Sequence, residues 1–157
     1  MKPVTQGTLE KSALRYLERR PSSRSNLQRI LTQKAAGEPE SERWIAEILE
    51  RCEALGYLND AEYSRSSIRV LRGKGASARR IRAKLREKGI DESLIDELLA
   101  EEPSGAEQAA AERYVERRRY GQDPVRKQKD LGALARAGFD YDVAHHALGQ
   151  GLRGDEE

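Results

Sequence analysis

The sequence is poor in the residues that build large cores, membrane spans and cross-linked domains. Of its 157 residues, 37% are hydrophobic and only 5% are aromatic. No apolar run approaches the ~18 residues of a membrane helix, and the first residues lack the apolar segment of a secretory signal. The single cysteine excludes an internal disulfide framework and a cysteine-rich metal site. We therefore expect a cytoplasmic protein that holds no metal and no cofactor and does not contact a membrane.

β-Branched residues are also scarce, which argues against a sheet protein. Val, Ile and Thr together number 15, whereas Ala, Leu, Arg and Glu are abundant, and this mixture favours helices. Apolar residues recur at helical spacing along the chain, and no alternating segment competes with that pattern. The sequence predicts an all-α fold.

Start and stop signals divide the chain into nine predicted helices. The first is expected to begin near Ala13. Two pairs have the spacing of capping boxes, namely Asn59 with Glu62 and Ser104 with Glu107. Glycine and proline residues end most of the predicted helices, which gives three sets of three.

An internal repeat supports this grouping. Every apolar position of the segment 88–99 recurs 49 residues later, in the segment 137–148. Repeats this small are stabilised by stacking on a neighbour, which favours an elongated array over the alternative of one compact helical bundle. We predict three tandem three-helix-bundle repeats over residues 13–58, 59–102 and 104–149, with a flexible N-terminus over 1–12 and a disordered tail over 150–157.

The formal net charge of +2 conceals blocks of opposite sign. Residues 1–64 are balanced, with 10 basic and 10 acidic side chains. Residues 65–88 have 10 basic and one acidic, residues 89–112 have eight acidic and no basic, and residues 113–136 have eight basic and three acidic. Such segregation indicates a patterned binding surface. Solvated helix faces, or pairing of the basic block with the acidic block beside it in sequence, are the alternatives.

The basic side chains of the second and third repeats are the candidate contacts to a partner. Arginine outnumbers lysine 21 to 8, and the guanidinium group suits two-pronged contact to phosphate or carboxylate. The partner is therefore expected to be a nucleic-acid backbone or an acidic protein surface. The candidates are Arg65, Arg69, Arg72, Lys74, Arg79, Arg80, Arg82, Lys84, Arg86, Lys88, Arg117, Arg118, Arg119, Arg126 and Lys129.

Enzymatic signals are weak. His145 and His146 are adjacent, so on a helix they point in different directions and are expected to form a surface pair rather than a metal site. Cys52 lies on the apolar stripe of its predicted helix, which indicates a core thiol. The chain has no glycine-rich phosphate loop of a known nucleotide-binding type. We expect neither an enzyme nor a small-molecule substrate.

Several short motifs, taken in order, resemble the RecX family of bacterial recombinase regulators. Each motif alone is weakly specific, but their order and spacing over residues 13–148 are much more so. The motifs are Ala13-Leu14-x-Tyr16-Leu17-x-Arg19-Arg20, Ser25-x-Leu27-x3-Leu31, Gly56-Tyr57-Leu58-Asn59-Asp60-Ala61-Glu62-Tyr63, Lys74-Gly75, Ile81-x3-Leu85-x2-Lys88-Gly89-Ile90, and Leu134-x3-Gly138-Phe139-x-Tyr141. One departure is the longer loop at residues 35–40, where a tighter glycine turn is usual.

The resemblance implies a fold and a function. It implies tandem three-helix repeats in an elongated, curved array. It also implies binding to RecA and to RecA–DNA filaments in the filament groove, with inhibition of ATP hydrolysis, strand exchange and co-protease activity. Such a protein would modulate homologous recombination, DNA repair and the SOS response, and would meet single- or double-stranded DNA directly or through the filament. The alternative is a helical protein that binds DNA independently of RecA.

Overall fold

The computed structural model describes the backbone of residues 3–154 and the side chains of residues 3–149. Within this part the chain is helical, with no strand, which confirms the predicted all-α class. No helix in residues 3–154 is long and apolar enough to cross a bilayer. The elements are α1 (Gln6–Arg19), α2 (Arg24–Ala35), α3 (Ser41–Ala54), α4 (Asp60–Gly73), α5 (Ala78–Glu87), α6 (Glu92–Ala100), α7 (Ala106–Arg118), the 3₁₀ helix η1 (Pro124–Arg126), α8 (Lys127–Arg136) and α9 (Tyr141–Gly154).

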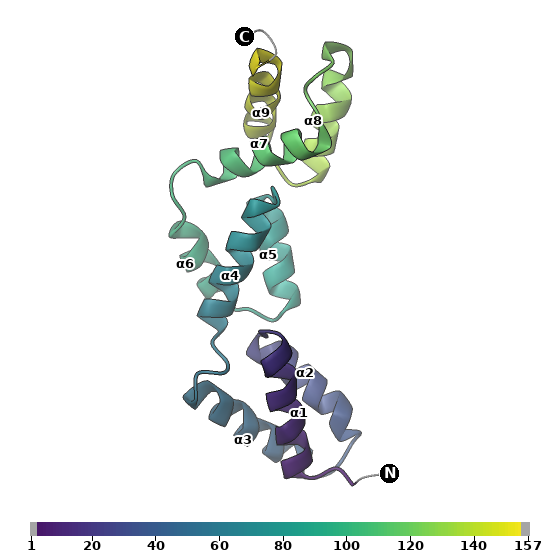
Figure 1. Ribbon diagram of the computed structural model, residues 1–157, viewed down its shortest axis with the longest axis vertical. Coiled ribbons are helices and arrows are strands. Elements are labelled where there is room, and N and C mark those ends of the chain that lie inside the picture. The colour runs from purple at the N-terminus through teal and green to yellow at the C-terminus, as the bar shows by residue number, and fades with distance from the viewer. Residues whose placement is uncertain (1–2, 155–157) are drawn as a thin grey trace.

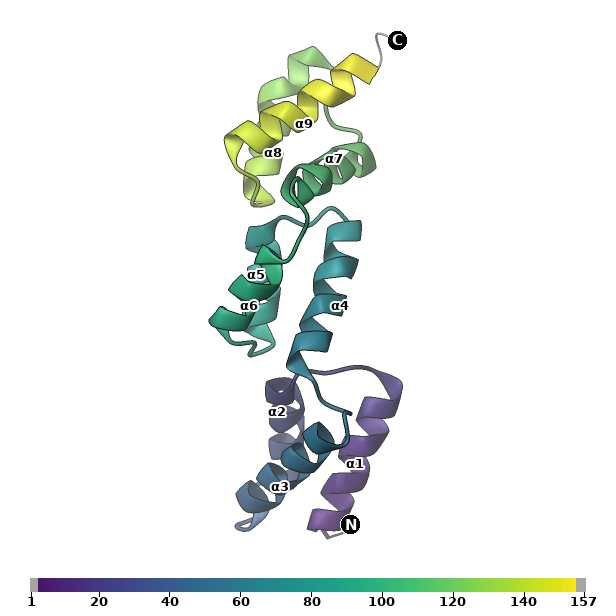
Figure 2. The same ribbon diagram turned by 90° about the vertical axis from the view of Figure 1, so that its left-hand side faces the viewer.

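The helices form an elongated array rather than one compact bundle (Figures 1 and 2). Three groups follow one another along the long axis: module 1 (α1–α3), module 2 (α4–α6) and module 3 (α7–α9). Helix α4 spans module 2 from the edge of module 1 to the edge of module 3 (Figure 2). The predicted tandem three-helix array is confirmed.

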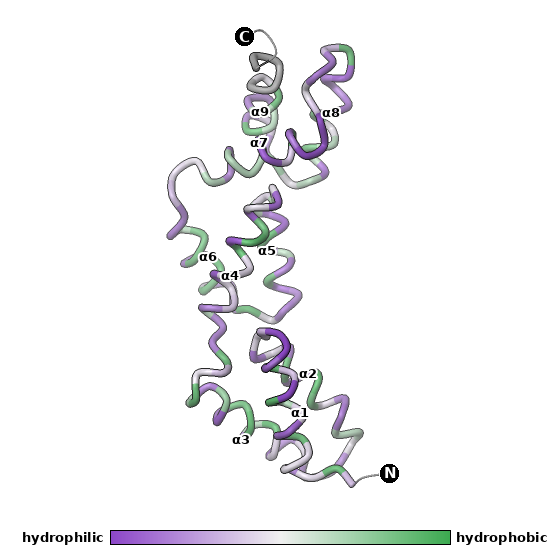
Figure 3. Tube along the Cα trace, in the orientation of Figure 1, coloured by the Kyte–Doolittle hydropathy of each residue, from purple (hydrophilic) through white to green (hydrophobic). Residues whose placement is uncertain are grey.

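Each module has its own small core. Residues from all three helices of module 1 form one buried cluster, which includes Leu27, Ile48 and Cys52. Separate clusters lie in module 2, around Ile81, and in module 3, around Leu134. Hydrophobic residues are accordingly spread over the whole length of the array (Figure 3). The predicted core position of Cys52 is confirmed, because the residue is buried in the first cluster.

The ends of the chain are more helical than predicted. Helix α1 begins at Gln6 because the Thr5 hydroxyl accepts a hydrogen bond from the Thr8 backbone N–H, and the Thr8 hydroxyl accepts one from the Thr5 N–H. This capping box makes the prediction of a flexible segment over 1–12 wrong for residues 6–12. Helix α9 continues to Gly154, so the predicted disordered tail is wrong for residues 150–154, and residues 155–157 lie outside the described part.

The two predicted capping boxes have different outcomes. The Asn59 side chain caps α4 by accepting from the Glu62 N–H, which confirms the predicted cap, but the Glu62 carboxylate pairs with Arg65 and does not complete the box. The box at Ser104 and Glu107 is wrong, because Gly105 is the N-cap of α7 and has a positive φ of 87°. The Glu107 carboxylate is instead turned towards module 2, where it contributes to the joint between two modules.

Successive modules are connected through the ends of their middle helices, α2, α5 and α8. The Ser23 hydroxyl, at the N-cap of α2, donates to the Lys88 carbonyl at the end of α5 over 2.6 Å. The Ser77 hydroxyl, at the N-cap of α5, donates in the same way to the Ala137 carbonyl at the end of α8 over 2.8 Å. The N-termini of α2 and α5 therefore each face the C-terminus of the next middle helix.

A carboxylate completes each joint. In the first joint Asp60, at the start of α4, accepts from the Arg24 backbone N–H at 2.9 Å. In the second joint Glu107, near the start of α7, accepts from the Ala78 backbone N–H, also at 2.9 Å. In both cases an acid from the following module satisfies the first free amide of a middle helix. The two joints are thus built to one plan.

Candidate functional site

The predicted contact residues of α5 divide between two faces of that helix. On the face towards α6, Arg82 pairs with Asp96 at 2.5 Å and lies 3.7 Å from Glu92. Arg86 also pairs with Glu92, and the hydrogen bond to that carboxylate raises the pKa of the Arg86 guanidinium. This face therefore shows intramolecular pairing with the acidic block of residues 89–112, which the sequence left open as an alternative.

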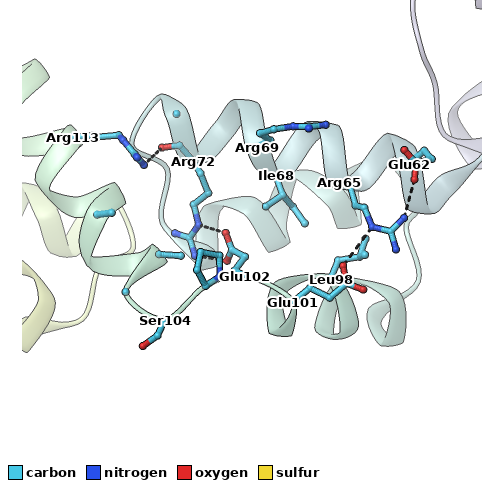
Figure 4. Close-up of a pocket in the computed structure, with 15 residues that line it drawn as sticks. Glu62, Arg65, Ile68, Arg69, Arg72, Leu98, Glu101, Glu102, Ser104 and Arg113 are labelled. Atoms are coloured by element: carbon cyan, nitrogen blue, oxygen red, sulfur yellow. Dashed lines mark hydrogen bonds and ion pairs between the residues drawn. The ribbon is translucent and has the colours of Figure 1, made fainter.

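Helix α4 repeats this division. Arg65 pairs with Glu62 at 2.9 Å and with Glu101 at 3.4 Å (Figure 4). Arg69 is exposed on the same helix, and in Figure 4 its side chain lies on the opposite side of α4 from Glu101. The helix thus presents one neutralised and one solvent-facing arginine within a single turn.

Arg72 is buried, so the prediction that it contacts a partner is wrong. Only 8% of its surface is exposed, and its guanidinium pairs with Glu102 at 2.9 Å and with Glu107 at 2.7 Å. Burial lowers the pKa of Arg72, but the hydrogen bonds to the two carboxylates outweigh burial and raise it. Arg72 is a structural residue of the joint between modules 2 and 3.

A cavity of about 630 Å³ lies beside these pairs, between α4, α6 and the start of α7 (Figure 4). Its lining includes Arg65 and Arg72 with Glu101 and Glu102, so charges of both signs line it and are largely paired with one another. Arg113 reaches the same region and donates to the Arg72 carbonyl at 3.2 Å. This cavity is therefore a poor candidate for binding a polyanion.

A second cavity, of about 380 Å³, lies at the joint between modules 2 and 3 and has a different character. We call it the basic cavity, because its charged lining residues are all cations: Lys74, Arg80, Lys84, Arg117 and Arg118. All five were predicted contact residues. Lys74 comes from the α4–α5 turn, Arg80 and Lys84 from α5, and the other two from α7, so two modules build the site.

The walls of the basic cavity hold two of its arginines in place. Arg117 donates one N–H to the Lys74 carbonyl at 3.1 Å, which leaves the rest of its guanidinium available. The guanidinium carbon of Arg118 lies 5.0 Å from the centre of the Tyr114 ring, a cation–π distance. Gly75 has a positive φ of 86°, and a Cβ at this position would lie only 2.9 Å from the Tyr114 backbone nitrogen. Because glycine has no Cβ, the α4–α5 turn can pack closely against α7 here.

The remaining predicted residues are exposed and spread over the array. Arg79 follows the cap of α5, and Lys88 lies beside the first joint. Arg119 ends α7 in the left-handed conformation. Arg126 and Lys129 line a smaller cavity of about 320 Å³ in module 3. They do not join the basic cavity, so the predicted set is divided between several places.

Sequence reasoning missed the residues that build the joints. Ser23 and Ser77 are caps whose hydroxyl groups also reach a neighbouring module, and their equivalent places in two repeats were the available signal. Asp130 was also missed: it is buried and accepts from the Gly121 N–H at 3.0 Å. An isolated Asp within a basic helix gives no sequence signal for this role.

Candidate metal ligands are not brought together in the part of the chain that the structure describes. No group of three or more His, Cys, Asp or Glu side chains there could hold a metal ion. His145 and His146 are both exposed, as predicted, and the His145 ring lies 5.7 Å from that of Tyr141.

The chain matches known proteins along most of its length. The family model described as the second three-helix domain of RecX matches residues 59–99, which is module 2. The regulatory protein RecX of Myxococcus xanthus is 32% identical over 158 residues, covering 89% of this chain and 83% of the relative. The RecX protein of a Mycobacterium species is also 32% identical, over 155 residues, with 92% and 81% covered.

Solved structures agree with the fold. The crystal structure of RecX from Lactobacillus salivarius superposes with a TM-score of 0.76 at 24% identity, covering 94% of this chain and 96% of that one. A second structure, described as regulatory protein RecX, superposes with a TM-score of 0.72 at 26% identity, with 89% and 70% covered. The order of the motifs, the three-module array and the extent of these matches together show that the chain belongs to the RecX family of regulatory proteins.

Proposed function

We propose that this protein regulates the RecA recombinase by binding RecA and RecA–DNA filaments in the filament groove. The observation that supports the proposal most is the array itself, three modules held in line by two joints of one design. A helical filament presents the same surface at regular intervals. An elongated array of fixed modules suits such a target, because it can contact successive subunits at once.

Bound in this way, the array would restrain the movements between RecA subunits that accompany ATP turnover. Inhibition of ATP hydrolysis, strand exchange and co-protease activity follows, and with it modulation of recombination, DNA repair and the SOS response. The exposed cations contact acidic protein surface or DNA phosphate. Arg82 and Arg86 contribute less than their positions on the helix suggested, since both already pair with acids of α6.

The test is the single-strand-dependent ATPase activity of the cognate RecA. Adding this protein at a stoichiometric ratio should lower the steady-state rate of hydrolysis on preformed filaments. An unchanged rate at stoichiometric excess, with binding of RecA to the DNA verified, would contradict the proposal. Strand exchange and RecA-dependent cleavage of a repressor should fall in parallel.

A charge reversal tests the basic side of module 2. Arg79→Glu replaces an exposed arginine, and Arg15→Glu makes the same change on exposed α1 of module 1. We expect Arg79→Glu to weaken inhibition more than Arg15→Glu, at equal helicity by circular dichroism. Equal inhibition by the two variants would remove Arg79 from the contact surface.

A further inference from the structure

The basic cavity concentrates charge that the protein does not neutralise. Five cations line a space of about 380 Å³, and no acidic side chain is among its lining residues in the described part of the chain. They come from module 2 and from module 3, so they repel one another across the joint. Such an arrangement is stabilised by an anion that binds between the modules.

The joint between modules 1 and 2 can be compared, residue by residue, with the joint that contains the basic cavity. Ser77 corresponds to Ser23, 54 residues earlier, and Glu107 corresponds to Asp60, 47 residues earlier, because each pair makes the same contact in the two joints. The buried residues of the first helices agree with this register. They are Ser64 and Ile68 in α4, and Ala111 and Val115 in α7.

The first joint lacks most of the charges found in the second. The offset of 54 residues applies to the cavity residues of module 2, and the offset of 47 applies to those of module 3. The counterparts at the first joint are Asn26 for Arg80, Ile30 for Lys84, Val70 for Arg117, Leu71 for Arg118 and Arg20 for Lys74. Four of the five positions are therefore uncharged at a joint that has the same hydrogen bonds. The cations are therefore not needed to build a joint.

The donors favour phosphate over carboxylate. They come from three segments, namely the α4–α5 turn, α5 and α7, and the tetrahedral oxygens of phosphate can accept from several directions at once. Base stacking has no platform here, because Arg118 lies over the Tyr114 ring. The site therefore suits a sugar–phosphate backbone contacted without regard to base sequence.

We propose that the basic cavity binds a phosphate group of a nucleic-acid backbone, and that this phosphate clamps module 2 to module 3. The site goes beyond the proposed function, since it belongs to the isolated chain and needs no recombinase. Occupied, it replaces repulsion across the joint with attraction from both sides. Nucleic acid thereby stiffens one joint of the array and leaves the other unchanged.

The first experiment measures binding of the full chain to a fluorescein-labelled single-stranded oligothymidylate by fluorescence anisotropy, without recombinase, at several salt concentrations. The variant Arg80→Gln/Lys84→Gln removes two exposed cations of the cavity, and Arg15→Gln/Arg19→Gln removes two exposed cations of α1. We expect the cavity variant to bind roughly ten-fold more weakly, with a log–log salt slope smaller by about 1.4. Equal losses in the two variants, or none in either, would overturn the proposal.

The second experiment tests the clamp and the class of anion. Oligothymidylate should raise the melting temperature of the wild-type protein, and should do so much less for the cavity variant or for Arg117→Gln, which removes a cation from module 3. Polyglutamate of equal charge should compete poorly. If polyglutamate binding depends on Arg80 and Lys84 while oligothymidylate binding does not, an acidic protein occupies the cavity and the proposal fails. Neither result bears on RecA ATPase inhibition, which is measured separately.

Discussion

Arginines that look alike in sequence differ widely in their surroundings. Arg69 and Arg72 lie three residues apart on α4, yet the first faces solvent and the second is buried between two carboxylates. Helical spacing predicted that both would lie on an exposed face. It could not show that the α6–α7 connection passes over Arg72 and brings Glu102 and Glu107 to it, because that depends on how two modules pack.

Arg72→Met should destabilise the protein substantially. Removing the guanidinium leaves Glu102 and Glu107 partly buried without their partner, which should cost about 3 kcal/mol in the free energy of unfolding. The control is Arg69→Met, on the exposed side of the same helix, which should change stability by less than about 0.5 kcal/mol. Urea denaturation followed by circular dichroism compares them, and similar midpoints would show that the buried pairs contribute little.

The single thiol should be protected by the fold. Cys52 is buried, and burial raises the pKa of its thiol, so little thiolate forms at neutral pH. A thiol reagent such as DTNB should react with the native protein far more slowly than with the urea-unfolded chain. Equal rates in the two states would place Cys52 at an accessible site.

The same pKa shift predicts the direction of an alkaline effect. Above the ordinary thiol pKa of about 8.5, the unfolded chain ionises Cys52 while the folded chain keeps it protonated. The stabilising contribution is therefore complete below that pH and is lost as the pH rises. Cys52→Ala should remove this part of the alkaline loss of stability, as measured by thermal unfolding from pH 7 to 10.

At the level of elements, local sequence signals predicted the helices well. They predicted poorly the contacts that helix ends make with neighbouring modules. Asn59 was found as a cap because the groups it joins lie three residues apart. Thr5 was overlooked, since its partner Thr8 is not the usual Glu or Gln of a capping box. Glu107 was given a local role by the same rule, although its partners lie about 30 residues earlier. Capping rules describe one helix at a time and take no account of a neighbouring module.

Ser77→Ala should cost more than the loss of an ordinary cap. The buried Ser77 hydroxyl accepts from the Arg80 N–H and donates to the Ala137 carbonyl, so the substitution removes a cap and a link between modules. We expect a loss of about 2 kcal/mol in the free energy of unfolding, against about 1 kcal/mol for Asn59→Ala, which removes a cap only. Hydrogen exchange should increase at α5 and at the end of α8 for Ser77→Ala. Exchange confined to α5 would show that the link is unimportant.

At the level of the whole molecule, the shape follows from the joints. The separate cores could be anticipated from the small repeats, and the periodicity of the apolar residues was enough to place them. The angle and spacing between modules depend on groups such as the Ser23 hydroxyl, which reaches the Lys88 carbonyl, and Gly138, which lies against Ser77. These contacts cross from one repeat to another, and a single sequence does not mark them.

Gly89→Ala should disturb the shape of the array. Gly89 has a positive φ of 75°, and a Cβ added there would overlap the Ser25 side chain across the first joint. Gly56→Ala is the matched control, because Gly56 has a positive φ of 81° and open space around it. Both variants should lose about 1 kcal/mol from backbone strain. Only Gly89→Ala should alter the distance distribution measured by small-angle X-ray scattering, and identical curves for the two would show that the joint tolerates the added methyl group.

The two joints also give the molecule a direction. Modules 1 and 2 each offer a serine at the N-terminus of their middle helix, and modules 2 and 3 each offer a carbonyl beside a left-handed glycine at its C-terminus. In module 1 the corresponding glycine is Gly37, and no atom in the described part of the chain lies within 4 Å of a Cβ built on it. A unit of the same design would therefore meet open space at this glycine. Length in such a protein is consequently an adjustable property, which gene duplication can change by whole units while the surface chemistry of each unit diverges.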